Sequence, residues 1–156
     1  MDNEFYMQKA IEVAKEGIQL GQTPFGAVIV KDDKIIACEH NRVWKNTDSS
    51  AHAEVQAIRA ACKNINSIDL SGATIYTTTE PCPMCFAAIH WAKISTIVFG
   101  AYIKDAQAAG FNELTISNEL MKSHGNSPVE IIPGIMNKQC AELFNLWKNS
   151  PKAKVY

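Results

Sequence analysis

Two cysteines and a histidine occupy positions from which they could bind one metal ion. Cys82 and Cys85 stand three residues apart in PCPMC, at the start of a predicted helix, and such residues share one helical face. His52 lies at the start of another predicted helix. Helix N-termini stabilise thiolates, and Zn²⁺ binds imidazole and thiolate in a tetrahedral shell. Three protein ligands would leave the fourth position to water, which is typical of a catalytic zinc site.

An acidic side chain follows this histidine closely. Glu54 lies two residues after His52 in the sequence HAE. A carboxylate beside a water activated by zinc can act as its general base. The alternative is that Glu54 only favours the positive start of a helix, or closes a capping box. Ser50 precedes Glu54 by four residues instead of three, so a capping box fits poorly.

The cysteines have two further interpretations. Cys82 and Cys85 could form a redox-active disulfide, or they could be buried apolar side chains. The chain has five cysteines, an odd number, and no segment typical of an export signal, so a disulfide framework is disfavoured. The combination with HAE favours metal binding. We read the other three cysteines, in apolar runs, as structural.

Composition restricts the class of protein. The 156 residues carry 15 basic and 16 acidic side chains, giving a net charge of −1, and 47% are hydrophobic. These values predict one globular domain over residues 1–156, located in the cytoplasm, without the length of apolar sequence that a membrane span needs. A near-neutral chain disfavours a nucleic-acid partner and leaves a local basic patch open.

Hydrophobic periodicity predicts the elements that must position these residues. β-rich apolar runs predict five strands, the first two forming a hairpin, at 25–30, 34–38, 73–79, 94–100 and 128–132. Helical spacing predicts helices over 3–20, 49–62, 82–92 and a last one after Pro133-Gly134. The expected cap of the second helix is Asp48, Ser49 or Ser50. Residues 104–127 show the weakest pattern.

A hairpin followed by alternating helices and strands predicts a three-layer α/β/α domain with a mixed sheet. The β–α–β unit around residues 73–100 should place its two strands parallel, with a right-handed crossover.

The two motifs together resemble a known superfamily. HAE at 52–54 and PCPMC at 81–85 match the H-x-E and P-C-x-x-C signature of the zinc-dependent cytidine deaminase superfamily. The resemblance runs from TPFGAVIV through FGA at 99–101. It implies a mixed five-stranded sheet, one Zn²⁺ per chain with a catalytic water, and hydrolytic removal of an amino group from a nucleobase. A noncatalytic zinc-stabilised binding module is the contrasting interpretation, and it gives Glu54 no role.

Within the superfamily, the chain is most similar to bacterial guanine deaminases and next to tRNA adenosine deaminases. Phe25 in TPFGA and the segment AAGF at 108–111 resemble the guanine branch. The ending WKNSPKAKVY resembles a segment whose terminal tyrosine, here Tyr156, closes the pocket. That branch often has Asp where this chain has Glu113, whereas VEIIPGIMNKQCAELF resembles the tRNA branch.

The resemblance implies conversion of guanine, or a related aminopurine or guanosine, to xanthine plus ammonia. Adenosine-to-inosine deamination of tRNA and a cytosine- or cytidine-type reaction are the alternatives. It also implies a homodimer, in which residues of about 134–156 could be exchanged between subunits. We expect substrate contacts from six residues: Asn41, the backbone N–H of Ala53, Phe25, Trp91, Glu113 and Tyr156.

Overall fold

A computed structural model describes residues 2–156 of the chain. The first part contains α1 (Asn3–Gln19), β1 (Gly26–Lys31), β2 (Lys34–His40), α2 (Val43–Asn46) and α3 (Ala53–Ile65). A β–α–β unit follows, made of β3 (Thr74–Thr79), α4 (Pro83–Trp91) and β4 (Thr96–Ala101). The last part contains α5 (Ile103–Ala108), α6 (Asn118–Gly125), β5 (Glu130–Ile132) and α7 (Asn137–Lys148).

The strands form one mixed sheet, as the sequence predicted. Its order is β2-β1-β3-β4-β5. β1 pairs antiparallel with both β2 and β3, whereas β3, β4 and β5 run parallel. The hairpin turns at Asp32 and Asp33, which both have positive φ angles of 51° and 59°. Such angles match the right-handed twist of the two strands that the turn connects.

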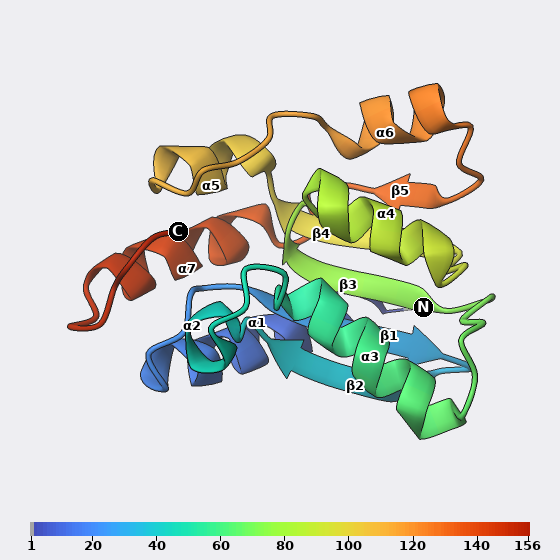
Figure 1. The fold of residues 1–156 in the computed structure, drawn as a ribbon, viewed down its shortest axis with the longest axis horizontal. Coiled ribbons are helices and arrows are strands. Elements are labelled where there is room, and N and C mark those ends of the chain that lie inside the picture. The colour runs from blue at the N-terminus through green and yellow to red at the C-terminus, as the bar shows by residue number, and fades with distance from the viewer. Residues whose placement is uncertain (1) are drawn as a thin grey trace.

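Helices cover both faces of this sheet (Figure 1). α1 and α7 pack on one face around Met7, Tyr76 and Leu143, which are almost fully buried. α3 and α4 lie on the other face, over a core that includes Ile75, Phe86 and Ile97. Because β3 contributes alternate side chains to both cores, its central position fixes the two helical layers relative to each other.

The structure corrects two parts of the sequence interpretation. His52 itself is the N-cap of α3, with extended backbone angles, so neither Asp48, Ser49 nor Ser50 caps this helix. Asp48 instead accepts hydrogen bonds from the backbone and hydroxyl of Ser50. The weakly patterned region 104–127 contains most of α5 and all of α6, which are short and were not predicted. A one- or two-turn helix offers too few positions to reveal its period.

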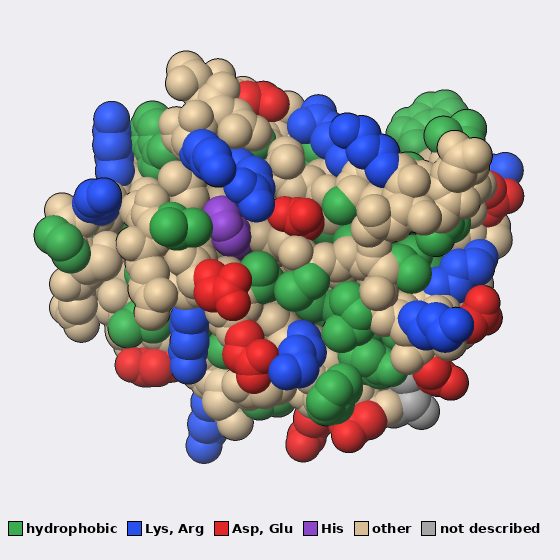
Figure 2. Space-filling view, turned by 90° about the horizontal axis from the view of Figure 1, so that it is seen from below, with side chains coloured by type: hydrophobic (Ala, Val, Ile, Leu, Met, Phe, Trp, Pro, Cys, Tyr) green, Lys and Arg blue, Asp and Glu red, His purple; other side chains and the backbone are tan. Residues whose placement is uncertain are grey.

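The surface mixes charges of both signs. On the face in Figure 2, Lys and Arg side chains alternate with Asp and Glu around a band of hydrophobic side chains. This distribution agrees with the near-neutral net charge of the chain. Among residues 2–156, no helix combines the length and apolarity that crossing a membrane requires.

Candidate metal centre and active site

Two helix N-termini meet at one end of the sheet. His52 is the N-cap of α3, and Cys82 is the N-cap of α4, where Pro83 occupies the first turn. Neither side chain makes a capping hydrogen bond, so both are free to face a ligand. Cys85 is the third residue of α4 and is fully buried. The positive ends of both helix dipoles therefore converge on the same point, which favours negatively charged ligands.

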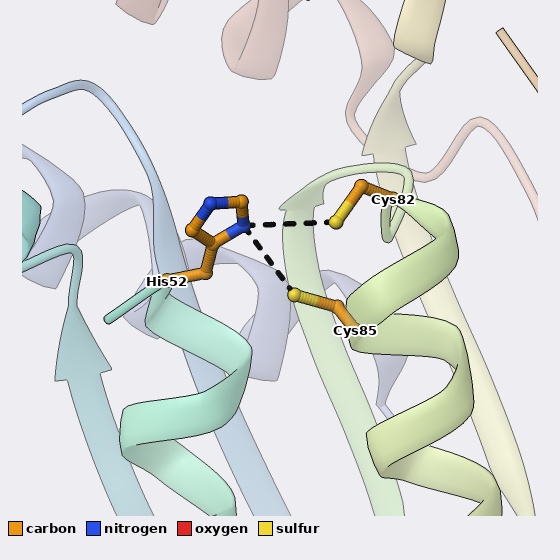
Figure 3. A group of neighbouring side chains, drawn as sticks. All are labelled: His52, Cys82 and Cys85. Carbon is orange, nitrogen blue, oxygen red and sulfur yellow. Dashed lines mark hydrogen bonds between the residues drawn. The ribbon is translucent and has the colours of Figure 1, made fainter. Parts of the chain in front are cut away.

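The spacing of the three ligand atoms fits a tetrahedral zinc ion. Nδ1 of His52 lies 3.6 Å from Sγ of Cys82 and 3.5 Å from Sγ of Cys85 (Figure 3). Zn–S and Zn–N bonds at a tetrahedral angle separate nitrogen and sulfur by about 3.6 Å. The three ligand atoms all lie within 4.8 Å of one another. All the cysteines are free, which contradicts the disulfide alternative.

The two thiols have pKa values shifted in opposite directions. A hydrogen bond from Cys85, opposed by burial and assisted by His52, lowers the pKa of Cys82 to about 4. The hydrogen bond to Cys82, together with burial, raises the pKa of Cys85 well above its ordinary value. Burial lowers the pKa of His52, but Cys82 and Glu54 outweigh that effect and raise it overall. One thiolate is thus already favoured before a metal binds.

Glu54 lies beside this centre, at the second position of α3. Its side chain is only 7% exposed, and it lines the same pocket as His52 and Cys82. Burial raises the pKa of Glu54, while the His52 charge opposes that shift. A carboxyl group with a raised pKa holds a proton more readily, and it can both accept and return one. Its position and pKa therefore suit a proton carrier.

Three other predicted residues reach this pocket. Its wall includes Phe25, Glu113 and Tyr156, together with Thr79 and Glu80. Burial, and then the negative charges of Cys82 and Glu54, raise the pKa of Glu113 to about 7. Phe25 packs edge-to-face against Phe111, with ring centroids 5.0 Å apart. The wall of the pocket therefore combines ionisable and aromatic side chains.

Tyr156 closes the pocket in this structure. Its hydroxyl accepts a hydrogen bond from Nδ2 of Asn41 at 2.7 Å and lies 3.3 Å from Oγ1 of Thr23. Its ring lies 5.2 Å from that of Phe111 and 5.9 Å from that of His52. The cavity that remains has a volume of about 30 Å³. This is room for about one water, and ligand pockets are typically about ten times larger.

Asn41 and Ala53 lie behind the pocket wall, and Asn41 is linked to the wall through Tyr156. Asn41 is fully buried, and its Oδ1 accepts a hydrogen bond from the backbone N–H of Val43 at 3.0 Å, while its Nδ2 binds Tyr156. Ala53 is also fully buried as the first residue of α3, and its side chain packs in the core between helix and sheet. Neither residue is part of the pocket wall.

Trp91 lies away from the pocket of its own chain. Trp91 is the last residue of α4, about 13 Å along the helix axis from Cys82, and it is 81% exposed. It contacts His90 and not the pocket. Because the sequence PMCFAAIHW is apolar on all sides, its pattern could not show which aromatic residue faces the site.

Glu80 holds the wall that carries Glu113. Its buried carboxylate accepts hydrogen bonds from the backbone N–H of Ile103 at 3.2 Å and of Asn118 at 2.9 Å. Nδ2 of Asn118 also donates to the carbonyl of Pro81 at 2.7 Å. Glu80 therefore fixes both ends of the segment 103–118 to the connection between β3 and α4. Glu80 and its two partners are 23 and 38 residues apart in the chain, so local sequence patterns do not reveal these contacts.

A larger hollow of about 330 Å³ lies near the C-terminal end of α4, lined in part by Phe86, Ile89 and His90. The metal-ligand group found among residues 2–156 is the one at His52, Cys82 and Cys85. Because the metal ligands His52 and Cys82 line the pocket of about 30 Å³ and not this larger hollow, the smaller pocket is the candidate site.

Comparison with known proteins agrees with this geometry. Residues 1–101 match the family described as the cytidine and deoxycytidylate deaminase zinc-binding region. The chain belongs to this family, and it is a zinc-dependent deaminase with the fold that the sequence predicted.

Particular relatives fall into two groups. The chain is 38% identical to the guanine deaminase of Bacillus subtilis (strain 168), over 100% of both chains. It is 36% identical to the tRNA-specific adenosine deaminase of the same organism, over 92% of this chain and 86% of that protein. A solved guanine deaminase from Nitrosomonas europaea superposes with a TM-score of 0.85, at 27% identity, covering 92% of this chain and 83% of that one.

The ligand set predicts how individual substitutions affect zinc content. His52→Ala, Cys82→Ser and Cys85→Ser should each lower the zinc content well below one ion per chain, because each removes one of three protein ligands. Glu54→Gln should retain zinc at the level of the unmodified protein, since Glu54 is not in the ligand group. Atomic absorption on the purified variants measures this. Full zinc in Cys85→Ser would contradict the ligand assignment.

The Glu80 contacts predict a loss of order in the pocket wall. Glu80→Gln should weaken at least one charge-assisted hydrogen bond, costing about 1.5–3 kcal/mol in the free energy of unfolding. Amide hydrogen exchange in residues 102–118 should accelerate, as mass spectrometry can measure. Glu119→Gln, an exposed acid in the same region, is the matched control and should change neither quantity. Unchanged exchange in Glu80→Gln would show that other contacts hold this segment.

Proposed function

We propose that this protein deaminates guanine, or a closely related aminopurine, to give xanthine and ammonia. The observation that supports it best is the pocket that joins the zinc-ligand triad to the carboxyl groups of Glu54, Glu80 and Glu113 and to an aromatic wall. The full-length relationship to a guanine deaminase, at 38% identity, supports the choice of base. A noncatalytic zinc module would need no buried carboxyl group beside the ligands.

In the proposed reaction, zinc would supply Lewis-acid activation of water at the position that His52, Cys82 and Cys85 leave open. Glu54 accepts a proton from that water as its oxygen bonds to C2 of guanine, and returns the proton to the adjacent ring nitrogen. Glu54 then takes the remaining hydroxyl proton and gives it to the amino group, which leaves as ammonia. The backbone N–H of Ala53 lies at the start of α3, where a developing negative charge is stabilised.

The remaining residues would bind the base. Phe25 offers an apolar face to the purine ring, and Glu113 can accept hydrogen bonds from ring N–H groups. Entry of a purine requires displacement of Tyr156, because the closed cavity is far smaller than a base. That displacement frees Nδ2 of Asn41 to donate to the substrate. Return of Tyr156 over the bound base would exclude water from the reaction.

Deamination of adenosine in tRNA is the second candidate. The 36% identity to a tRNA-specific adenosine deaminase over most of both chains favours it. Such an enzyme must accept a base flipped out of an RNA loop and hold its backbone through basic side chains. The chain has a net charge of −1, and the face shown in Figure 2 mixes charges of both signs. These features favour the small-molecule substrate.

A substrate panel tests the proposal directly. The zinc-loaded protein is assayed for ammonia release from guanine, guanosine, adenine, cytosine, cytidine and a tRNA anticodon stem-loop. We expect turnover of guanine, and at least a 10³-fold lower rate in Glu54→Gln, because the general base is lost. Zinc content and thermal unfolding of that variant serve as controls. Turnover of the stem-loop alone, weakened by added salt, would establish the tRNA reaction instead.

We also propose that the enzyme is a homodimer in the cytoplasm. Exposed apolar side chains at Leu114, Ile116 and Leu120, with exposed fractions of 66%, 42% and 48%, support a contact near the pocket wall. Residues 134–156 would be exchanged between subunits, with Pro133-Gly134 as the hinge, where Gly134 has a positive φ of 78°.

The segment beyond α7 is mostly exposed. Besides the Tyr156 side chain, Nε1 of Trp44 donates to the carbonyl of Lys154 at 3.0 Å and the N–H of Asn112 donates to the carbonyl of Tyr156 at 3.2 Å. An exchanged tail would make these contacts to the other subunit.

Complementation between two inactive variants tests the exchange. The first variant is Glu54→Gln, and the second lacks residues 154–156 and should lose at least 10-fold in kcat/KM because its pocket stays open to water. If tails are exchanged, dissociating and reassociating a 1:1 mixture should restore up to about a quarter of the sites. Analytical ultracentrifugation confirms dimers in each sample. A mixture that stays inactive would show that each chain closes its own pocket.

A further inference from the structure

Thr79 places a buried hydroxyl group without a partner at the pocket. It is the last residue of β3, only 6% exposed, and it is part of the pocket wall. Within residues 2–156, its Oγ1 has no hydrogen-bond partner. A buried hydroxyl is normally satisfied, because leaving it unpaired is unfavourable. A molecule bound in the pocket could form the hydrogen bond that the Thr79 hydroxyl lacks.

Thr79 differs from Thr77 and Thr78, the two threonines before it on β3, in its hydrogen bonding and its position. Successive strand residues point to opposite faces, so Thr77 and Thr79 face the α3–α4 layer whereas Thr78 faces away. Oγ1 of Thr78 accepts a hydrogen bond from the backbone N–H of Gly26 at 3.1 Å. Thr77 also has an unpartnered Oγ1, but it is fully buried and lies one strand repeat below the pocket. Only Thr79 thus combines an unpaired hydroxyl with a place in the pocket wall among these three.

The other polar groups at this end of the pocket already have roles. Glu80 accepts hydrogen bonds from two backbone N–H groups, Cys82 is a metal ligand, and Glu54 carries protons. Thr79 ends β3 three residues before Cys82, and it lines the same small pocket as the metal ligands His52 and Cys82. The reacting carbon and its amino group must lie beside these ligands.

We propose that the Thr79 hydroxyl hydrogen-bonds the amino group on the reacting carbon of the substrate, orienting it to leave as ammonia. This assignment rests on the proposed aminopurine deaminase function. A hydroxyl group suits the task because it can accept from the amino N–H while the amino group is attached to the ring. It can also donate to the nitrogen lone pair once the amino group no longer conjugates with the ring.

Binding measurements in the Glu54→Gln background test this contact without turnover. Guanine and hypoxanthine, which lacks the amino group, are titrated by calorimetry into the zinc-loaded protein. Thr79→Val should weaken guanine binding about 10-fold and leave hypoxanthine binding within about twofold. Thr79→Ser, which keeps the hydroxyl, should restore guanine binding. Thr77→Val is the matched control, since it removes an unpaired buried hydroxyl outside the pocket and should change neither affinity.

Kinetics with Glu54 present completes the test. Thr79→Val should lower kcat for guanine, whereas Thr77→Val should leave both kcat and KM unchanged. Equal guanine affinity in Thr79→Val and Thr77→Val, or equal loss of both bases in Thr79→Val, would overturn the assignment. Failure of the unsubstituted protein to turn over guanine would overturn the proposed function itself, and with it this assignment. The two failures are therefore distinguishable.

Discussion

The meeting of two helix N-termini at the end of β3 is the constraint on which the site depends. α3 and α4 begin with His52 and Cys82, two residues that take the extended backbone angles of an N-cap without making a capping bond. Each helix therefore leaves its first backbone N–H groups and its dipole directed at the same small volume. The thiolates that would hold a metal ion, and any negative charge that develops beside them, are stabilised by that arrangement before other side chains are considered.

The sheet makes this meeting possible. The parallel pairing of β3 and β4 requires α4 to cross over the face of the sheet and start where β3 ends. α3 packs on β1 and β2 in the same layer and contacts α4. The buried core between these helices and the sheet, which includes Ala57, Phe86 and Ile89, fixes their separation. The nitrogen–sulfur distances near 3.5 Å at the surface of that core are thus a consequence of apolar packing below it.

Local sequence patterns were sufficient for the strands, the four longer helices and the ligand motifs, because each depends on residues close together in the chain. They failed where distant contacts decide the outcome. The α6 helix begins where Asn118 meets Glu80, and Asn41 is turned toward Tyr156, a residue at the other end of the chain. Trp91 was misplaced because an apolar helix has no period to orient it. The sequence does not single out Thr79, because a threonine in a β-rich run is ordinary and only the three-dimensional structure shows that its hydroxyl is unpaired.

The attachment of the 103–118 segment at both of its ends has an evolutionary consequence. The Glu80 carboxylate accepts hydrogen bonds from the backbone N–H groups of Ile103 and Asn118, and every amino acid except proline has such a group. These two hydrogen bonds therefore do not depend on which side chains lie between residues 103 and 118. Lengthening a segment whose ends are already fixed adds only a small entropic cost. The interior of this segment can thus change in length and sequence while the zinc ligands keep their places. A protein with this fold could thus acquire a preference for a different base by changing only the segment 103–118 of the pocket wall.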